Sequence, residues 1–371
     1  MDKAWYSVTN AYEVFSPALL VYPQRVLANI ERMIAIAGDV DRLRPHVKTH
    51  KMAELAHMHL EKGIKKFKCS TLAEAQMLAE SGAEDILLAY QPVGPNIHAF
   101  CKLAKKYSQI KFAALVDTVN ILRALSTAAR SHQVEIGIFL DLNSGMNRTG
   151  ISIGSDAKAL YQFISALPQV YQAGLHAYDG HFRDPDFEKR KTGSDEAFQT
   201  VWDFEKALLE EGQEVPEIIA GGSPTFPVHA QRARVVLSPG TYVFWDAGYG
   251  EMMQELPFEP AAMILSRVIS KPADHLICVD LGHKSIAAEN PIDKRVRFLN
   301  LEVEAYVGHS EEHLILQPKH PENVQVGDIL YGIPWHICPT VALHQEAYVV
   351  EGEKTSERWK VVARNRLYVI N

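Results

Sequence analysis

A short basic segment near the N-terminus carries the residue types best suited to unusual chemistry. Residues 44–51 read Arg-Pro-His-Val-Lys-Thr-His-Lys, with two lysines, an arginine and two histidines. Because Leu43 and Val47 alternate with polar residues, we expect residues 42–48 to form a strand that ends at Lys48. A solvated basic loop is the ordinary interpretation, since lysine is rarely buried unless paired. The alternative is a lysine whose amine serves as a nucleophile for a carbonyl cofactor.

Two glycine turns further along the chain could bind a phosphate group. Residues 220–225 read Ala-Gly-Gly-Ser-Pro-Thr, and residues 238–242 read Ser-Pro-Gly-Thr-Tyr. Paired glycines let backbone N–H groups approach an anion, and the hydroxyls of Ser223 and Thr225 add donors. A simple tight turn explains the first motif equally well. Its place after a predicted strand favours the phosphate interpretation, because barrel loops after the last strands often bind phosphate.

Two other motifs place polar side chains at the ends of predicted strands. Residues 141–150, Asp-Leu-Asn-Ser-Gly-Met-Asn-Arg-Thr-Gly, put Arg148 in a glycine-bounded loop. Its guanidinium is permanently charged and forked, so it could clamp a carboxylate or a phenolate. Residues 174–181, Gly-Leu-His-Ala-Tyr-Asp-Gly-His, supply three further candidates: His176, Tyr178 and His181. A surface turn and structural histidines are the ordinary interpretations of these two motifs.

A His-x-Cys pair near the C-terminus could bind a metal ion. Residues 334–341 read Pro-Trp-His-Ile-Cys-Pro-Thr-Val. If this segment is a strand, His336 and Cys338 share one face, and an imidazole and a thiolate can bind an ion such as zinc. Two ligands suit a site at which substrate and water complete the coordination, although the spacing also arises by chance.

Strand-like runs that alternate with helical patterns predict the fold that positions these residues. Helical patterns at residues 71–81 and 156–166 separate some of the runs. Eight such runs predict a closed parallel (β/α)8 barrel with helices outside, and a doubly wound open sheet is the alternative. The runs lie at residues 42–48, 66–70, 85–90, 111–116, 134–141, 172–178, 216–220 and 234–238.

Polar residues where these runs finish favour the barrel, because its catalytic face lies at the carboxyl ends of the strands. They are Lys48, Ser70, Gln91, Asp117, Asn143, Tyr178, Ser223 and Gly240.

The sequence pattern changes after about residue 250, where short apolar runs follow one another without helical patterns between them. This predicts an all-β second domain. We therefore expect an α/β barrel followed by a C-terminal β domain. Residues 1–22 would supply an N-terminal strand to the β domain, residues 23–250 the barrel, and residues 251–371 the β domain with its metal pair.

Composition points to a soluble protein with small-molecule partners. The 371 residues are 47% hydrophobic and 22% charged, and the net charge of -7 argues against nucleic-acid binding. No apolar run approaches the roughly 20 residues of a membrane span, and residues 1–10 lack the features of a signal peptide, so we expect a cytoplasmic location. Four widely separated cysteines predict free thiols or a ligand thiolate rather than disulfides.

Together these motifs resemble the pyridoxal-phosphate (PLP) enzymes with an alanine-racemase-like barrel of fold type III, specifically the D-serine dehydratase and D-threonine aldolase family. The Pro-His-x-Lys and His-x-Cys-Pro-Thr motifs carry the resemblance most specifically. It implies that Lys48 is the Schiff-base lysine. Arg148 would approach the cofactor's phenolic oxygen, with Tyr178 near the pyridine ring and His176 in the same cofactor-binding set. The phosphate would be held by Gly222, Ser223, Thr225, Gly240 and Tyr242.

The resemblance also implies that His336 and Cys338 bind a divalent metal, zinc or manganese, and that the enzyme is a lyase for a D-3-hydroxy amino acid. Candidate substrates are D-serine, D-threonine and 3-hydroxyaspartate. The amine of Lys48 would move the α-proton, and the metal would bind the substrate hydroxyl. His181 is a candidate second base.

Dehydration to a 2-keto acid and ammonia is favoured over aldol cleavage, because the aldolase branch tends to carry His-x-Asp at the metal and a histidine shortly after the strand-six tyrosine. This chain has Cys338 and Asp184 there. An amino-acid racemase and a non-catalytic PLP carrier are further candidate functions. By analogy with the fold we expect a homodimer.

Overall fold

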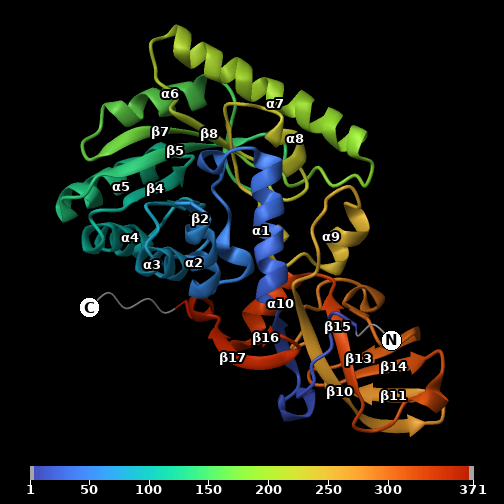
Figure 1. Ribbon diagram of the computed structural model, residues 1–371. Helices are drawn as coiled ribbons and strands as arrows, with labels where there is room; N and C mark the ends of the chain where they lie inside the picture. The colour runs from blue at the N-terminus through green and yellow to red at the C-terminus, as the bar shows by residue number, and fades with distance from the viewer. Residues whose placement is uncertain (1–3, 367–371) are drawn as a thin grey trace. The chain divides into compact units, whose positions relative to one another are not determined.

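The computed structural model describes residues 4–366, which fold into two compact units (Figure 1). The barrel unit comprises residues 33–48, 53–240 and 365–366. The sheet unit comprises residues 4–32, 49–52 and 241–364. None of the helices within the described range is long and apolar enough to cross a membrane.

Seven parallel strands form the framework of the barrel unit. Both faces of these strands are covered, so they read as nearly continuous apolar runs, as buried parallel strands do. A two-residue strand, β6 (Ile151–Ser152), adds to the end of β5. In spatial order the seven are β2 (Lys66–Cys69), β3 (Asp85–Leu88), β4 (Lys111–Val116), β5 (Ile136–Asn143), β7 (Val170–Ala177), β8 (Glu217–Ala220) and β9 (Val235–Leu237).

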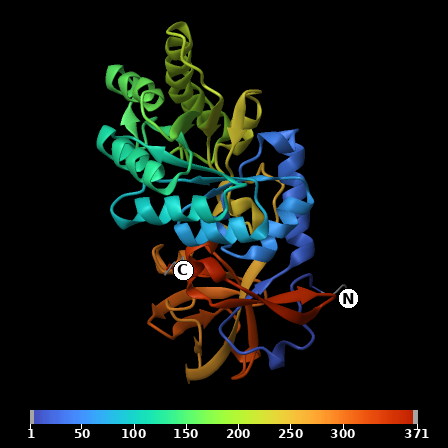
Figure 2. The ribbon, with the colours of Figure 1, turned by 90° about the vertical axis from the view of Figure 1, so that its left-hand side faces the viewer.

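Helices follow the strands and cover the outside of this sheet (Figure 2). The start of α3 shows how sequence sets a boundary, because Thr71 caps it by accepting a hydrogen bond from the backbone N–H of Glu74. The helix ends at Ser81, and Gly82 follows it with a φ of 95°, the left-handed conformation that glycine favours. The helices are α2 (Ala53–Glu61), α3 (Leu72–Ser81), α4 (Pro95–Lys106), α5 (Val119–His132), α6 (Ser155–Ser165), α7 (Phe187–Glu210) and α8 (Phe226–Ala230), while α1 (Pro23–Ala37) contains a unit boundary.

The prediction of a regular strand at residues 42–48 is wrong in detail. Two 3-10 turns, η2 (Val40–Arg42) and η3 (Val47–Thr49), flank a short extended piece. Within it Leu43 pairs with Leu237 of β9 and His46 pairs with Lys68 of β2. Residues 43–46 therefore join the two edge strands of the sheet and close the barrel, although single bridges to two neighbours do not form a regular strand ladder.

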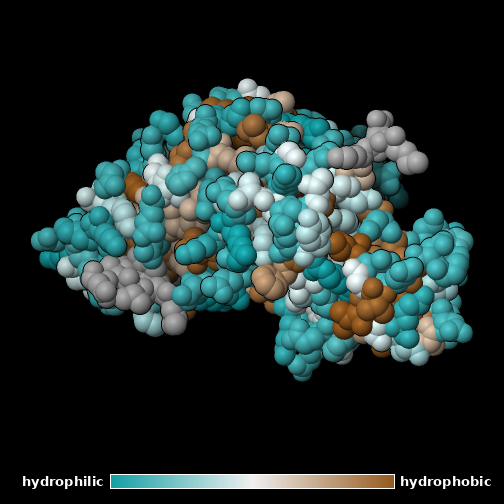
Figure 3. All heavy atoms as spheres, turned by 60° about the horizontal axis from the view of Figure 1, so that its bottom comes forward, coloured by the Kyte–Doolittle hydropathy of each residue, from teal (hydrophilic) through white to brown (hydrophobic). Residues whose placement is uncertain are grey.

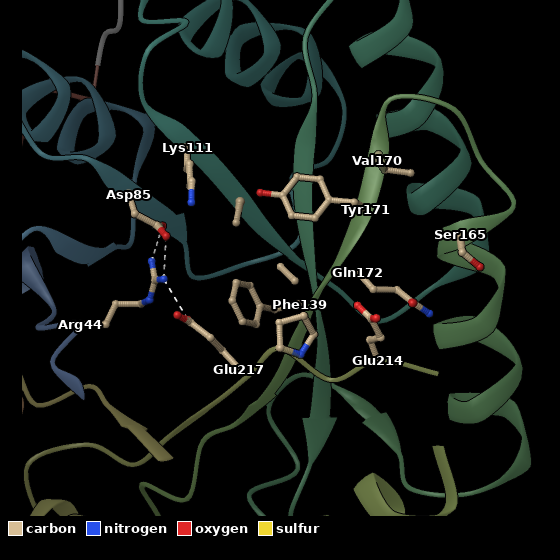
Figure 4. A pocket seen from close by; sticks show the side chains of 13 residues that line it. Arg44, Asp85, Lys111, Phe139, Ser165, Val170, Tyr171, Gln172, Glu214 and Glu217 are labelled. Carbon is tan, nitrogen blue, oxygen red and sulfur yellow. Dashed lines mark hydrogen bonds and ion pairs between the residues drawn. The ribbon is translucent and has the colours of Figure 1, made fainter. Parts of the chain in front are cut away.

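The barrel interior is layered. Apolar side chains form one buried cluster, consisting of Leu87, Ala113, Leu115, Phe139, Ala173, Ile219 and Val236. At the amino ends of the strands, Arg44 is 1% exposed and pairs with Asp85 at 2.5 Å and with Glu217 at 3.1 Å. A cavity of about 610 Å³ opens beside this ion cluster, with Lys111 and Tyr171 among its lining residues (Figure 4). The catalytic candidates lie at the opposite, carboxyl ends of the strands.

The sheet unit is built on a mainly antiparallel sheet. Strand β1 (Ala18–Val21) pairs antiparallel with β10 (Ala262–Ala273) and parallel with β16 (Glu346–Glu351), so a segment from the N-terminus lies inside this sheet. Leu20, Met263 and Tyr331 belong to its core. The remaining strands are β11 (Leu276–Val279), β12 (Val296–Phe298), β13 (Val303–His309), β14 (Leu314–Pro318), β15 (Ile329–Pro334) and β17 (Lys354–Lys360).

The fold class is confirmed as an α/β barrel followed by a mostly antiparallel β unit. The expectation that no helix interrupts the C-terminal β runs is wrong, because α10 (Ile337–Leu343) lies between β15 and β16. A second short helix, α9 (Ala247–Met252), precedes β10. Helix α10 matters below, because the predicted metal pair lies at its start.

Candidate active site

Lys48 lies on a tight turn near the carboxyl end of β2. It occupies the middle of η3 and is half-buried, and its backbone N–H donates to Nδ1 of His46 at 3.3 Å. Since His46 pairs with Lys68 near the end of β2, the turn brings Lys48 to the rim expected for a barrel active site. A 3-10 turn, rather than a strand end, therefore presents the lysine.

A second lysine lies within this site and was not predicted. Lys68 is 4% exposed, and its Nζ lies 2.8 Å from Nε2 of His176. The other ring nitrogen of His176 lies 2.7 Å from Oδ1 of Asp141. Alternation along β2 places Lys66 and Lys68 on the inner face of the barrel, a signal that becomes readable only once the strand is known to be buried on both faces.

Burial and neighbouring charges set the protonation of this chain of side chains. Burial, followed by the nearby charge of Lys48, lowers the pKa of Lys68 to about 7. Burial also lowers the pKa of His176, and the charge of Lys68 lowers it further, against the opposing effect of Asp141. Burial alone would raise the pKa of Asp141, but its hydrogen bond with His176 holds that pKa below its usual value. Asp141 is therefore ionised and His176 is neutral near pH 7.

Tyr178 packs against the first glycine turn beneath Arg148. The Arg148 guanidinium lies 4.8 Å from the centre of the Tyr178 ring, and the Lys68 amine lies 5.6 Å from it. A Cβ at Gly222 would come within 3.0 Å of the ring, and one at Gly180 within 2.3 Å of the phenol oxygen. Both glycines are therefore needed for this position of Tyr178.

A buried carboxylate anchors the first glycine turn. Asp179 accepts hydrogen bonds from the Thr225 hydroxyl at 2.6 Å and from Ser194 at 3.1 Å, and it contacts His229 Nε2 at 2.8 Å. Burial raises the pKa of Asp179, but His229 and the hydroxyl donors outweigh this and hold it below its usual range. The Thr225 hydroxyl proton is thus committed to Asp179, and Thr225 fixes the turn from below.

The structure brings the two glycine turns together. The backbone N–H of Gly240 points to Oγ of Ser223 at 3.4 Å. Ser238 is 4% exposed, and among the described residues its hydroxyl has no hydrogen-bond partner. Because Val236 belongs to the interior cluster, alternation places Ser238 on the same inner side of β9's continuation. Tyr242 belongs to the sheet unit, where it is buried and its ring centre lies 5.7 Å from that of Phe258.

His181 lies on the surface of the turn that follows β7. It is exposed, and its ring centre lies 4.0 Å from that of Phe182. Its Nε2 would come within 3.2 Å of a Cβ at Gly145, so His181 borders the loop that carries Arg148. Of the predicted barrel residues it is the one with an exposed imidazole.

The barrel residues fit an anionic carbonyl cofactor such as PLP. Lys48 offers an amine, and Lys68 and Arg148 add positive charge close by. The unpartnered hydroxyl of Ser238 and the hydroxyl of Ser223 lie at the adjoining glycine turns, where a phosphate requires donors.

His336 and Cys338 lie together at the start of α10. The prediction that they share one face of a strand is wrong, because β15 ends at Pro334, His336 is the N-cap residue of α10 and Cys338 lies in its first turn. The pair is nevertheless brought together by a side-chain hydrogen bond. Pro339 in the first helical turn is the signal that could have indicated a helix start.

Hydrogen bonds from several segments of the sheet unit hold this pair. The Cys338 sulfur lies 3.3 Å from the Thr49 hydroxyl, and His336 Nδ1 lies 2.5 Å from Glu289. Asp246 accepts from the backbone N–H of Ile337 at 3.0 Å and so fixes the start of α10. Contacts with Thr49, Glu289 and Asp246 therefore fix the positions of His336 and Cys338.

The two side chains of the pair shift each other's pKa toward the charged forms. Burial lowers the pKa of His336, but its hydrogen bonds with Cys338 and Glu289 raise it to about 9. Burial raises the pKa of the Cys338 thiol, but the hydrogen bond with His336 outweighs this and holds it below its ordinary value. No group of three or more His, Cys, Asp or Glu residues suited to a metal occurs within residues 4–366. On a bound ion, an imidazole and a thiolate alone would leave positions for water or substrate.

Two family models match the chain. The model described as alanine racemase, N-terminal domain, matches residues 21–247, and the model described as putative serine dehydratase domain matches residues 261–350. The chain is 30% identical to a D-threonine aldolase of Arthrobacter sp, covering 95% of this chain and 93% of that protein. It is 28% identical to a 3-hydroxy-D-aspartate aldolase of Paracoccus denitrificans (strain Pd 1222), covering 96% and 94%.

Further similarities extend to a dehydratase and to a solved structure. The chain is 24% identical to a D-threo-3-hydroxyaspartate dehydratase of Delftia sp. (strain HT23), over 70% of this chain and 69% of that protein. The crystal structure of a D-threonine aldolase from Filomicrobium marinum superposes with a TM-score of 0.89 at 27% identity, covering 98% of this chain and all of the other.

Proposed function

The chain belongs to the family whose barrel is the alanine racemase N-terminal domain, and on that premise we propose that it is a PLP- and divalent-metal-dependent lyase of D-3-hydroxy amino acids. Its relatives are named aldolases and dehydratases, which are lyases. The observation that carries the proposal is one chain with Lys48 beside Lys68 in the barrel unit and a His336–Cys338 pair in the sheet unit.

The barrel residues have separate roles in this proposal. When bound, PLP supplies an electron sink that weakens the bonds at the substrate's α-carbon. Lys48 would hold the cofactor through its aldehyde, and its Nζ would take or return the α-proton of the substrate. Arg148 would face the phenolic oxygen, and His176 and Tyr178 would orient the ring. Gly222, Ser223 and Gly240 would hold the phosphate, with Thr225 fixing the first turn and Tyr242 as a further candidate.

The metal pair supplies the second half of the chemistry. His336 and the Cys338 thiolate would bind zinc or manganese, and such an ion acts as a Lewis acid toward a hydroxyl oxygen. His181, exposed beside the Arg148 loop, is the proposed second base.

Two reaction outcomes are open to such a site. In dehydration the substrate loses its α-proton and its 3-hydroxyl group as water, and hydrolysis of the resulting enamine gives a 2-keto acid and ammonia. In cleavage the hydroxyl loses its proton, the Cα–Cβ bond breaks, an aldehyde leaves, and the α-carbon takes a proton to give glycine. Cys338 and Asp184 favour dehydration by the resemblance noted from the sequence, whereas the 30% identity to a D-threonine aldolase favours cleavage.

A substrate panel separates these outcomes. We expect the purified protein, with PLP and either zinc or manganese, to convert at least one of D-serine, D-threonine and D-3-hydroxyaspartate. Keto acid with ammonia identifies dehydration, and glycine with an aldehyde identifies cleavage. The L-isomers serve as controls. No product from any D-isomer with either metal would refute the proposal.

The assignment of Lys48 has a direct test. Borohydride reduction followed by peptide mass spectrometry should find the cofactor fixed on Lys48. Lys48→Ala should lose the visible cofactor band, while Lys51→Ala, three residues later on the same segment, should keep it. Label on another lysine would contradict the assignment.

We also propose that the chain forms a homodimer, by analogy with other proteins of this fold. The sheet unit exposes large hydrophobic side chains, including Phe15, Val307 and Val326. Hydrophobic residues also form groups among hydrophilic ones on the face of the molecule that Figure 3 shows. Light scattering should give twice the chain mass of 41.5 kDa, and a monomer at working concentration would contradict the proposal.

A further inference from the structure

Lys68 is a buried titratable group in the barrel, and the proposed chemistry gives it no task. It is enclosed in the barrel at 4% exposure, although lysine is among the residues least often fully buried. Its amine contacts an imidazole rather than a carboxylate, with Nζ 2.8 Å from His176 Nε2. A lysine kept in such a place needs a reason, because its charged form is costly to bury.

The hydrogen-bond partners fix the direction of each bond. Asp141 can only accept when ionised, so the proton on the His176 ring that faces it lies on Nδ1. Nε2 of a neutral ring is then a bare acceptor, and Lys68 can donate to it in either of its own protonation states. A proton on Nε2 would instead point directly at the Lys68 amine.

The surrounding charges also favour a neutral His176 ring. Lys48, Arg148 and Arg44 all act on Lys68 as cations, and Asp141 is the carboxylate that offsets them. Lys68 and Arg148 also oppose a positive charge on His176. An imidazolium would add one more cation to this buried group, in which Asp141 already offsets the charge of Lys68.

We propose that Lys68 is a positioning residue of the cofactor site: by donating to Nε2 it holds His176 as a neutral imidazole whose proton lies on Nδ1 and faces Asp141. His176 then presents an uncharged ring of fixed orientation, and the positive charge of the site comes from the lysines and Arg148. Only the purpose of this role, which is to orient a ring beside the cofactor, rests on the proposed PLP site. The Lys68–His176–Asp141 arrangement itself consists of contacts between side chains of the chain.

The matched control lies on the same strand. Lys66 shares the inner face of β2 with Lys68, but its amine pairs with Glu217 at 2.6 Å and lies at the other end of the barrel. Lys66→Met therefore removes a lysine from the same strand without removing the donor to His176. Lys68→Arg retains a cation and N–H donors at the position itself.

The first experiment follows His176 directly in the full-length protein without added PLP. Two-dimensional NMR of ¹⁵N-histidine-labelled protein reports the tautomer and the titration of each ring, and a His176→Gln spectrum assigns the signal. We expect a neutral Nδ1–H ring in the wild type at pH 7. In Lys68→Met the titration midpoint should rise by about one pH unit or more, because a neighbouring cation is lost while Asp141 remains. Lys68→Arg and Lys66→Met should keep the wild-type behaviour.

The second experiment uses the PLP-loaded protein. The pH at which the visible cofactor band changes should move in Lys68→Met and stay in place in Lys66→Met. An unchanged His176 titration in Lys68→Met, or an equal change in Lys66→Met, would overturn the proposal. So would a Lys68→Arg protein whose His176 is protonated at pH 7. Because the NMR readout needs no cofactor, failure of the proposed lyase function would leave it unaffected and is distinguishable from failure of this inference.

Discussion

Glu289 contacts Nδ1 of His336 at 2.5 Å through Oε1, so Nε2 is the ring nitrogen that a metal ion would use. Carboxylates that hold the second nitrogen of a ligating histidine fix its orientation and raise its basicity. In the proposed metal site, Glu289 would be the supporting carboxylate of His336.

Glu289→Gln should weaken metal binding by about 10–100-fold, because the ring loses its charged partner. The dissociation constant for zinc can be measured by competition with a chromophoric chelator. Glu346→Gln is the matched control, since Glu346 pairs with Arg358 in the same unit and does not contact the metal pair. Equal zinc affinity in Glu289→Gln and wild type would contradict the supporting role.

Arg44→Met should lower the thermal stability of the protein. The guanidinium is 1% exposed and pairs with both Asp85 and Glu217, so its removal deprives Asp85 of this counter-charge and leaves Glu217 with the Lys66 amine as its partner. Loss of one partner of a buried ion pair costs roughly 3–5 kcal/mol. The adjoining cavity admits water to the carboxylates, so we expect the lower end, about 3 kcal/mol, seen as a fall in Tm.

The control for Arg44→Met is an exposed ion pair. Arg358→Met removes the partner of Glu346, where the two side chains are 48% and 36% exposed. Surface pairs contribute about 0–1 kcal/mol, so this variant should melt close to the wild type. A Tm for Arg44→Met equal to that of Arg358→Met would show that the barrel ion cluster does not stabilise the fold.

Gly222→Ala should weaken PLP binding. The new Cβ would lie 3.0 Å from Cε2 of Tyr178, so the ring or the turn must shift. Crowding of this kind typically costs about 1–3 kcal/mol, which is roughly tenfold or more in Kd. Absorbance titration with PLP measures the change. Gly154→Ala is the control, because nothing lies within 4 Å of a Cβ at Gly154; equal affinities for both variants would contradict the packing argument.

Much of the barrel could be predicted because its strands are short apolar runs buried on both faces. The run at residues 111–116 coincides with β4, and Thr71 marks the start of α3 as a capping residue should. Residues 42–48 deviate because their backbone bridges two different neighbours, β9 and β2, and no local pattern encodes such shared pairing. Tertiary closure of the barrel, rather than local propensity, sets this segment.

The candidate site also divides into features that local sequence predicts and features that depend on the tertiary fold. The spacing of His336 and Cys338 in the sequence identified them as a candidate pair. The start of helix α10, where they lie, is set by His336 as N-cap residue and by the hydrogen bond from Ile337 to Asp246. Lys68 was missed because Lys-Phe-Lys-Cys reads as a half-exposed strand, and only the closed barrel turns both of its lysines inward. Residues with distinctive chemistry are visible in the sequence, whereas their buried partners depend on which faces the fold encloses.

His59 should make the folded state sensitive to acid. It is 2% exposed in α2, with Nδ1 2.5 Å from the Leu55 carbonyl oxygen, and burial lowers its pKa from 6.5 to about 4. Between these values the unfolded chain binds a proton that the folded chain excludes, so stability falls as the pH drops from about 6.5 to 4. The full loss is about 3 kcal/mol.

This acid sensitivity should disappear in His59→Gln, which cannot titrate. Urea unfolding at pH 7 and at pH 4.5 should show the wild type losing about 2–3 kcal/mol more than His59→Gln over this range. His320→Gln is the control, because the side chain of His320 is 59% exposed and its replacement should leave the wild-type pH dependence in place. Since other groups titrate in both proteins, the difference between the two curves isolates His59. Parallel curves for wild type and His59→Gln would mean that His59 is protonated within the folded barrel.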